Sequence, residues 1–442
     1  MKMKKTVSTV LCAALMAASL ISCGTADNTT SQNNTRKSGD VTLQFMGWEA
    51  SVYETEANKA CLQSFMDQNP GIKVEYISGP SEEHHTKLLT MMAGGAAPDT
   101  FYMDVPFYRQ FIEQGQLLDL TDIYHQYYKE EDFLPWSATK SKVGDKFYGI
   151  DSCIVGNILF YNRDLFEKAN VEMPPSNPDE AWTWEEFLDA AQKLTIKNGD
   201  TVEQYGAFGF EVDFMPLQQY LVNMGVTIFN EDYTSCKISD PDKMIDVMQK
   251  FKDLRVKYGV APEANVSSKS GMSANQMLQT GKIAMVNQGS FSMQELANMD
   301  FDFGVAPLPT MDGKTMNAVL SSYNVAGWTG TKHKEETLKL ISHLASTDFQ
   351  LPFVQSGLWM SNRVEMYEPE NQDQWFNPDV HPAEFVNMTS IFKNAIVAPT
   401  HMAGANVRDI TDEEIKNFYY NDQDAQTTIL NIEKRATEAL SK

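Results

Sequence analysis

The sequence has few basic residues, no Cys-x-x-Cys motif and only one long apolar run. Its 36 lysines and arginines stand against 59 aspartates and glutamates, which gives a net charge of −23. A field of that sign repels nucleic acid and anionic lipid headgroups, so we expect no nucleic-acid partner. Most of this charge is interpreted as an aid to solubility, and it argues weakly against an anionic ligand.

The sequence also lacks the common catalytic and metal-binding motifs. No His-Glu-x-x-His, no Gly-x-Ser-x-Gly and no phosphate-binding Gly-x4-Gly-Lys-Ser/Thr occurs. We interpret His84 and His85, which follow two glutamates, as a solvated helix end. Adjacent acids such as Glu130 and Glu131 cannot be told from a solvated face. The sequence therefore offers no candidate catalytic residue, and we expect no metal and no cofactor.

The one long apolar run, from Val7 to Ile21, follows three lysines and ends at Ser22-Cys23. This pattern is typical of a bacterial lipoprotein signal, and the run is short for a membrane span. We predict a signal peptide over residues 1–22, lipid on Cys23 and a flexible polar linker over 23–40. The protein would then be extracytoplasmic and touch the membrane through its lipid anchor alone.

Three further cysteines, Cys61, Cys153 and Cys236, lie far apart in the sequence. One disulfide among them remains open, but buried free thiols are favoured.

Strand and helix patterns alternate from residue 41 onward. Strands are predicted at 41–47, 72–77 and 99–104, with helices at 53–68 and 81–92 between them. The pattern restarts with a strand at 158–162 and a helix at 163–169. Thr183 and Glu186 form a predicted capping box, and further strands are expected at 283–287 and 303–307. Such alternation indicates parallel β-α-β units in an α/β fold, with ligands bound beyond the carboxyl ends of strands.

Several segments, in order, resemble the extracellular solute-binding proteins of sugar ABC importers, the maltose-binding-like group. They are Met92-Ala-Gly-Gly-Ala-Ala-Pro98-Asp99, Phe147-Tyr-Gly-Ile150, Trp182-Thr-Trp-Glu-Glu-Phe187, Gly281-Lys-Ile-Ala-Met285 with Gly289-Ser-Phe291, and Gly304-Val-Ala-Pro-Leu-Pro309. The resemblance implies a two-lobe periplasmic-binding-protein-like fold (type II), with the ligand cleft between lobes joined by hinge crossings. It places lobe 1 at 41–151 and 310–332, and lobe 2 at 152–309 and 333–442.

Sugars need aromatic platforms and paired hydrogen bonds from carboxylates, amides or arginine. Trp48 and Glu49 follow the first strand, although Glu49 also suits a solvated turn. Glu82 begins the second helix, where ordinary dipole compensation is the alternative. Asp104 follows the third strand and matches a family position that often meets ligand. Asp151 lies at the proposed crossing.

The resemblance supplies the other candidate residues. Phe214 and Phe291 match positions where the family often has an aromatic, and Gly289 would let the backbone approach the ligand. Ser322 and Tyr323 replace a Gly-rich turn, so Tyr323 either narrows the site or packs in the hinge. Trp359 and Arg363 lie in a segment that lacks the family's usual proline; an interlobe ion pair is the alternative for Arg363.

The resemblance implies a monomeric receptor that is not an enzyme. We expect it to capture a sugar, specifically an oligosaccharide, and to deliver the sugar to an ABC transporter permease. Two alternatives stay open at this point. One is an exported carbohydrate-active enzyme, and the other is the same fold binding a polyamine or a peptide.

Overall fold

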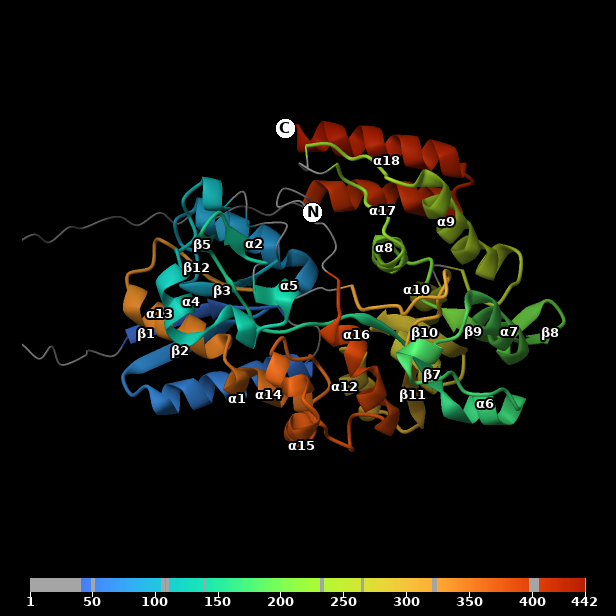
Figure 1. Ribbon diagram of the computed structural model, residues 1–442, viewed down its shortest axis with the longest axis horizontal. Helices are drawn as coiled ribbons and strands as arrows, with labels where there is room; N and C mark the ends of the chain where they lie inside the picture. Colours follow the sequence, from blue (N-terminus) through green and yellow to red (C-terminus); the bar gives the residue numbers. More distant parts are fainter. Residues whose placement is uncertain are drawn as a thin grey trace, which may run out of the picture. The chain divides into compact units, whose positions relative to one another are not determined.

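A computed structural model describes residues 41–48, 52–104, 108, 111–138, 140–230, 234–263, 266–319, 324–396 and 405–441. Residues from Asp40 to Lys442 form one compact unit. Among the described residues the strands form two five-stranded sheets and a small two-stranded one. The fold is the predicted mixed α/β fold with two lobes, one built on each large sheet (Figure 1).

The first sheet has the strand order β2-β1-β3-β12-β6. Strands β1 (Val41–Met46), β2 (Ile72–Ile77) and β3 (Thr100–Met103) are parallel, as the alternating pattern predicted. Strand β12 (Asn324–Gly327) is antiparallel to both β3 and β6 (Ile150–Asp151). The helices and strands that accompany this sheet are α1 (Val52–Gln68), α2 (Ser81–Ala93), α4 (Thr121–Tyr127), η1 (Glu130–Asp132), α5 (Pro135–Ala138), β4 (Lys142–Val143) and β5 (Lys146–Phe147).

The second sheet has the order β11-β7-β10-β9-β8. Strand β7 (Asn157–Asn162) lies antiparallel to β10 (Ile283–Gly289) and β11 (Phe303–Ala306), whereas β9 (Thr201–Phe208) is parallel to β10 and antiparallel to β8 (Ile196–Asn198). The helices that follow or flank these strands are α6 (Arg163–Ala169), η2 (Pro178–Glu180), α7 (Trp184–Leu194), α8 (Phe214–Asn223), α9 (Pro241–Val256), α10 (Val266–Ser270), α11 (Ala274–Gln279), α12 (Ser292–Ala297), η3 (Val364–Tyr367), η4 (Pro369–Asn371), α15 (Gln372–Trp375), η5 (Ala383–Met388), α16 (Thr389–Lys393), α17 (Ala405–Tyr420) and α18 (Ala425–Leu440).

The capping box at the start of α7 is confirmed. The Glu186 backbone N–H donates to Thr183 Oγ1 at 3.2 Å, and the Thr183 N–H donates to Glu186 Oε2 at 2.8 Å. This reciprocal pair satisfies two amides that the helix itself leaves without partners. Behind the cap, Trp184 and Phe187 enter an aromatic core with Phe210 and Phe251.

Two helices lie with the first sheet although the sequence placed them with the second lobe. Helices α13 (Lys334–Leu344) and α14 (Thr347–Gln355) contact β1, β3, β12 and α1, so the orange segment of Figure 1 lies beside the blue one. Their residues Leu340 and Phe349 share a core with Phe45. The boundary predicted at 332/333 is therefore wrong for residues 334–355. One other predicted lobe limit, at residue 310, also differs from the structure. The remaining limits stay predictions.

Residues 310–319, which the sequence placed with the first lobe, pack with the second. Thr310 pairs with Thr183, Met316 joins the aromatic core of α7, and Ala318 packs in the other core of the second sheet. The crossing back to the first sheet thus comes after Val319 and not before Thr310.

The described residues contain no helix that is both long enough and apolar enough to cross a membrane. Cys61, Cys153 and Cys236 are buried free thiols, as favoured. Burial raises the thiol pKa of Cys61 to about 11 and that of Cys236 to about 12, which keeps both protonated near neutral pH.

Gly206 offers a test of the packing between β9 and α7. A Cβ atom at this position would lie 1.9 Å from the Ala191 backbone oxygen, so the strand or the helix must shift. We predict that Gly206→Ala lowers the free energy of unfolding by about 2 kcal/mol or more. Gly79→Ala is the matched control because nothing lies within 4 Å of its Cβ position. Equal melting temperatures for the two variants would contradict this packing.

Candidate functional site

In the described part of the chain, three connections between the two sheets can be located. One crossing joins β6 to β7, the second follows Val319, and the third follows α14. The first and third are paired, because Ile154 and Met360 exchange backbone hydrogen bonds of 3.0 and 2.9 Å. This pair forms the described part of the hinge.

A buried polar network surrounds this hinge. Ser137 Oγ donates to Asp151 Oδ2 at 2.6 Å, and Asn362 Nδ2 donates to the Asp151 backbone oxygen at 2.8 Å and to Ser137 Oγ at 3.1 Å. Gln350 Nε2 in turn donates to Asn362 Oδ1 at 3.1 Å. The structure thus places Asp151 at the crossing, with its side chain 2% exposed. Ligand contact by Asp151 stays a prediction.

Trp359 and Arg363 lie in the core of the first lobe. The Trp359 ring stacks on Phe353 with centroids 3.9 Å apart. The Arg363 guanidinium lies 3.7 Å from the Phe133 ring centroid and 4.7 Å from that of Tyr128, and burial lowers its pKa. No described carboxylate pairs with Arg363 within 4.0 Å, so the cation–π contacts take the place of the interlobe ion pair. Their role in ligand binding remains a prediction.

Trp48 lies at the carboxyl end of β1, packed against two histidines. Its ring centroid is 4.7 Å from that of His84 and 5.5 Å from that of His85. Burial lowers the pKa of His84 to about 4 and that of His85 to about 3, so both are neutral near pH 7. The interpretation of a solvated helix end is wrong, because His84 is buried and its Nε2 donates to the Tyr102 backbone oxygen at 2.8 Å.

Asp104 follows β3 beside these histidines, and its backbone N–H donates to His85 Nε2 at 3.1 Å. Desolvation raises the pKa of its carboxyl group to about 6, against the opposing charges of Lys140 and Arg408. Arg408 belongs to α17, which packs in the core of the second lobe. The positive charges that act on Asp104 therefore come from Lys140 and from Arg408 of the second lobe.

Phe214 is held near the same cation. Its backbone N–H donates to Asp412 Oδ1 at 2.7 Å, while Arg408 Nε lies 3.9 Å from Asp412 Oδ2. The Phe214 side chain itself is buried in the core of the second lobe. The structure thus brings the backbone at Phe214 toward the charged side chains that flank Asp104. Ligand contact by Phe214 is a prediction still.

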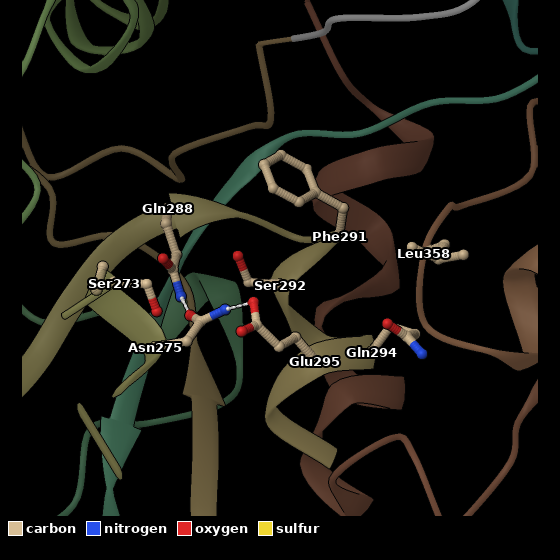
Figure 2. Close-up of a pocket in the computed structure, with 9 residues that line it drawn as sticks. Ser273, Asn275, Gln288, Phe291, Ser292, Gln294, Glu295 and Leu358 are labelled. Carbon is tan, nitrogen blue, oxygen red and sulfur yellow. Dashed lines mark hydrogen bonds between the residues drawn. The ribbon is translucent and has the colours of Figure 1, made fainter. Parts of the chain in front are cut away.

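Among the described aromatic residues of the predicted site, Phe291 is the exposed one, with 40% of its surface accessible. It precedes α12 and borders a pocket whose wall also includes Asn275, Gln288 and Glu295 (Figure 2). Gly289 lies directly beneath, since a Cβ atom there would come within 2.1 Å of the Phe291 ring. The Gly-x-Phe spacing therefore allows the ring to fold back over its own strand.

Four predicted site features lie outside the described residues. They are Glu49, Ser322, Tyr323 and the side chain of Glu82. The predicted lipid site Cys23 and the linker lie outside as well. Within the described part of the chain, no group of three or more His, Cys, Asp or Glu side chains is placed to hold a metal ion.

Sequence reasoning missed several residues of this region. Arg408 and Asp412 carry no motif, and only the fold brings α17 toward β3. The recognised Gly289-Ser-Phe291 segment does not include Asn275, which precedes it in the sequence, or Glu295, which follows it. The paired histidines were visible in the sequence, but their burial under Trp48 was not.

A family model described as "Bacterial extracellular solute-binding protein" matches residues 47–351. The chain belongs to this family. Family membership makes it an extracytoplasmic binding protein, and it confirms the resemblance inferred from the ordered segments.

Curated relatives of this solute-binding protein cover most of its length. A putative binding protein of Brucella abortus is 23% identical over 91% of this chain and 94% of its own. The galactooligosaccharide-binding protein of Bacillus subtilis is 24% identical over 78% of each chain.

Solved structures show the same fold. A substrate-binding protein of Listeria monocytogenes in complex with cycloalternan matches with a TM-score of 0.79 and 20% identity, over 91% of this chain and 99% of its own. Maltose-bound MalE3 of T. maritima matches with a TM-score of 0.73 and 23% identity, over 91% and 99%.

The raised pKa of Asp104 predicts a pH-dependent stability. Between about pH 4 and pH 6 the folded chain keeps a proton that the unfolded chain loses, so the free energy of unfolding falls as pH rises through this window. We expect Asp104→Asn to raise that free energy by about 2 kcal/mol at pH 7 and to remove this part of the pH dependence. Urea denaturation at pH 4 and pH 7 measures it. The exposed Asp300→Asn serves as control, and an equal gain in both variants would contradict a special environment at Asp104.

Proposed function

We propose that this solute-binding protein captures a sugar, and specifically an oligosaccharide, between its two lobes and delivers it to the permease of an ABC importer. The observation that carries the proposal is the exposed Phe291 ring beside amide and carboxylate side chains in a chain of this family. A sugar ring offers an apolar face for such an aromatic and hydroxyls for such polar groups.

The relatives support the same ligand class. Two relatives are a galactooligosaccharide-binding and an arabinooligosaccharide-binding protein, and two structural neighbours are in complex with cycloalternan and with maltose. The lobes would close around the ligand, because contacts to both walls form only in the closed state and shift the population toward it. The closed form would then dock on the permease.

Thermal denaturation of the full chain against a sugar panel tests this function. A ligand that binds only the folded state stabilises it by about 2.7 kcal/mol at a concentration 100 times its Kd. We expect galactotriose, arabinotriose, maltotriose or cycloalternan to raise the melting temperature by several degrees, with the sugar recovered unchanged by chromatography. A shift with a polyamine or a peptide alone, or conversion of the sugar to products, would contradict the proposal.

Lipid attachment at Cys23 is the second part of the proposal, and it rests on the leader ending in Leu20-Ile21-Ser22-Cys23. We expect the chain to incorporate labelled palmitate and to sediment with membranes of a bacterial host. Cys23→Ser should abolish the label and leave the protein out of the anchored fraction. Cys12→Ser is the matched control, because that residue lies inside the predicted leader. Labelling that survives in Cys23→Ser would disprove this anchor site.

A further inference from the structure

The pocket beside Phe291 has a volume of about 190 Å³ and walls from both lobes. Asn275, Gln288, Gln294 and Glu295 come from the second lobe, whereas Leu358 belongs to the core cluster of the first. Figure 2 shows Asn275, Gln288 and Glu295 grouped below the Phe291 ring, with Gln294 apart from them on the side of Leu358. Pockets for drug-sized ligands measure roughly 300–1,000 Å³, so this one suits a single sugar ring.

The polar side chains form a hydrogen-bonded chain with one direction. Gln288 Nε2 donates to Asn275 Oδ1 at 2.5 Å, and Asn275 Nδ2 donates to Glu295 Oε2 at 2.6 Å (Figure 2). Asn275 is only 6% exposed, so its amide is fixed in this orientation by both partners. The hydrogen-bonded chain therefore runs from Gln288 through Asn275 and ends at the Glu295 carboxylate.

Two acceptor oxygens of this wall have no hydrogen-bond partner among the described residues. Glu295 Oε1 receives no hydrogen bond from the described residues, and the buried Gln294 Oε1 also lacks a described partner. A carboxylate oxygen can only accept hydrogen bonds when it is ionised. A ligand group that meets these two oxygens must therefore be a donor, such as a sugar hydroxyl, whereas the Ser273 and Ser292 hydroxyls and the Gln294 amide of the same wall can also donate.

The charges that line the pocket favour a neutral ligand over an anionic one. The residues that line it include no lysine, arginine or histidine, and no described cation lies within 4.0 Å of Glu295. A ligand carboxylate brought here would face the Glu295 charge without a counter-ion, and like charges placed together in an interface cost several kcal/mol.

We propose that this pocket is a one-ring subsite in which the sugar stacks on Phe291 and donates hydroxyl hydrogen bonds to Glu295. Glu295 is then a specificity-determining residue that admits neutral rings and rejects rings bearing a carboxylate. This inference rests on the proposed sugar-binding function and adds to it the class of sugar accepted.

Two matched pairs of monosaccharides test the charge selection. D-Galactose is compared with D-galacturonate, and D-glucose with D-glucuronate, by ligand-observed NMR titration of the full chain. We expect at least one neutral hexose to bind, and its uronate to bind at least about tenfold more weakly. Glu295→Gln keeps the shape and removes the charge, and it should bring the two affinities to within about threefold of each other.

The control variant is Asp300→Asn, which removes the same charge from an exposed position after α12 and should leave the ratio as in the wild type. Phe291→Ala should weaken the neutral hexose and the uronate alike, since it removes the stacking surface. Melting temperatures identify any variant that has lost its fold, and Glu295→Ala provides a second charge-free variant in that case.

The outcomes separate this inference from the function on which it rests. Equal binding of hexose and uronate by the wild type, or equal effects of Glu295→Gln and Asp300→Asn, overturns the subsite alone. Binding of a panel oligosaccharide with no binding of either hexose also overturns the subsite alone. Failure of every sugar, oligosaccharides included, overturns the proposed function and this inference together.

Discussion

The two lobes depend on how the chain satisfies buried polar groups where it crosses between them. Asn362 has no exposed surface. Its Nδ2 donates to Ser137 Oγ and to the Asp151 backbone oxygen, and its Oδ1 accepts a hydrogen bond from Gln350. A buried polar group left without a partner costs about 1–3 kcal/mol. Loss of one member of this network would therefore destabilise the fold, because it would leave the partners of that residue without a hydrogen bond. The backbone pairing of Ile154 with Met360 then joins two crossings into one connection.

Each lobe is packed around its own sheet. Each sheet has its own core, and each presents strand ends toward the other lobe: β1 and β3 from the first, β10 from the second. A ligand that contacts both Asp104 and Phe291 would favour one arrangement of the lobes over another. The close contact of Gly289 with the Phe291 ring fixes the aromatic surface before any ligand arrives.

Local patterns predicted the elements well, and the chain path poorly. Strand β2 and helix α6 begin and end at the predicted residues, and the Thr183 capping box is present, because these features depend on neighbours within a few positions. The placement of α13 and α14 failed for a physical reason. An amphipathic helix shows that one face must be buried, but not which sheet it covers. Similarly, the sequence predicts that Arg363 contacts ligand or forms an interlobe ion pair, and only the fold places Phe133 and Tyr128 against it.

The same acidic composition produces two different carboxylates in this molecule. Asp104 is desolvated at the end of β3, where burial favours its neutral form, although Lys140 and Arg408 oppose that effect. Glu295 instead stands at the end of an amide chain, partly exposed and without a cation among its described neighbours. The carboxyl group of Asp104 can change its charge as pH or a ligand changes its surroundings, whereas Glu295 accepts a hydrogen bond from Asn275. Net charge alone describes neither, because the surroundings of each carboxylate decide what it can bind.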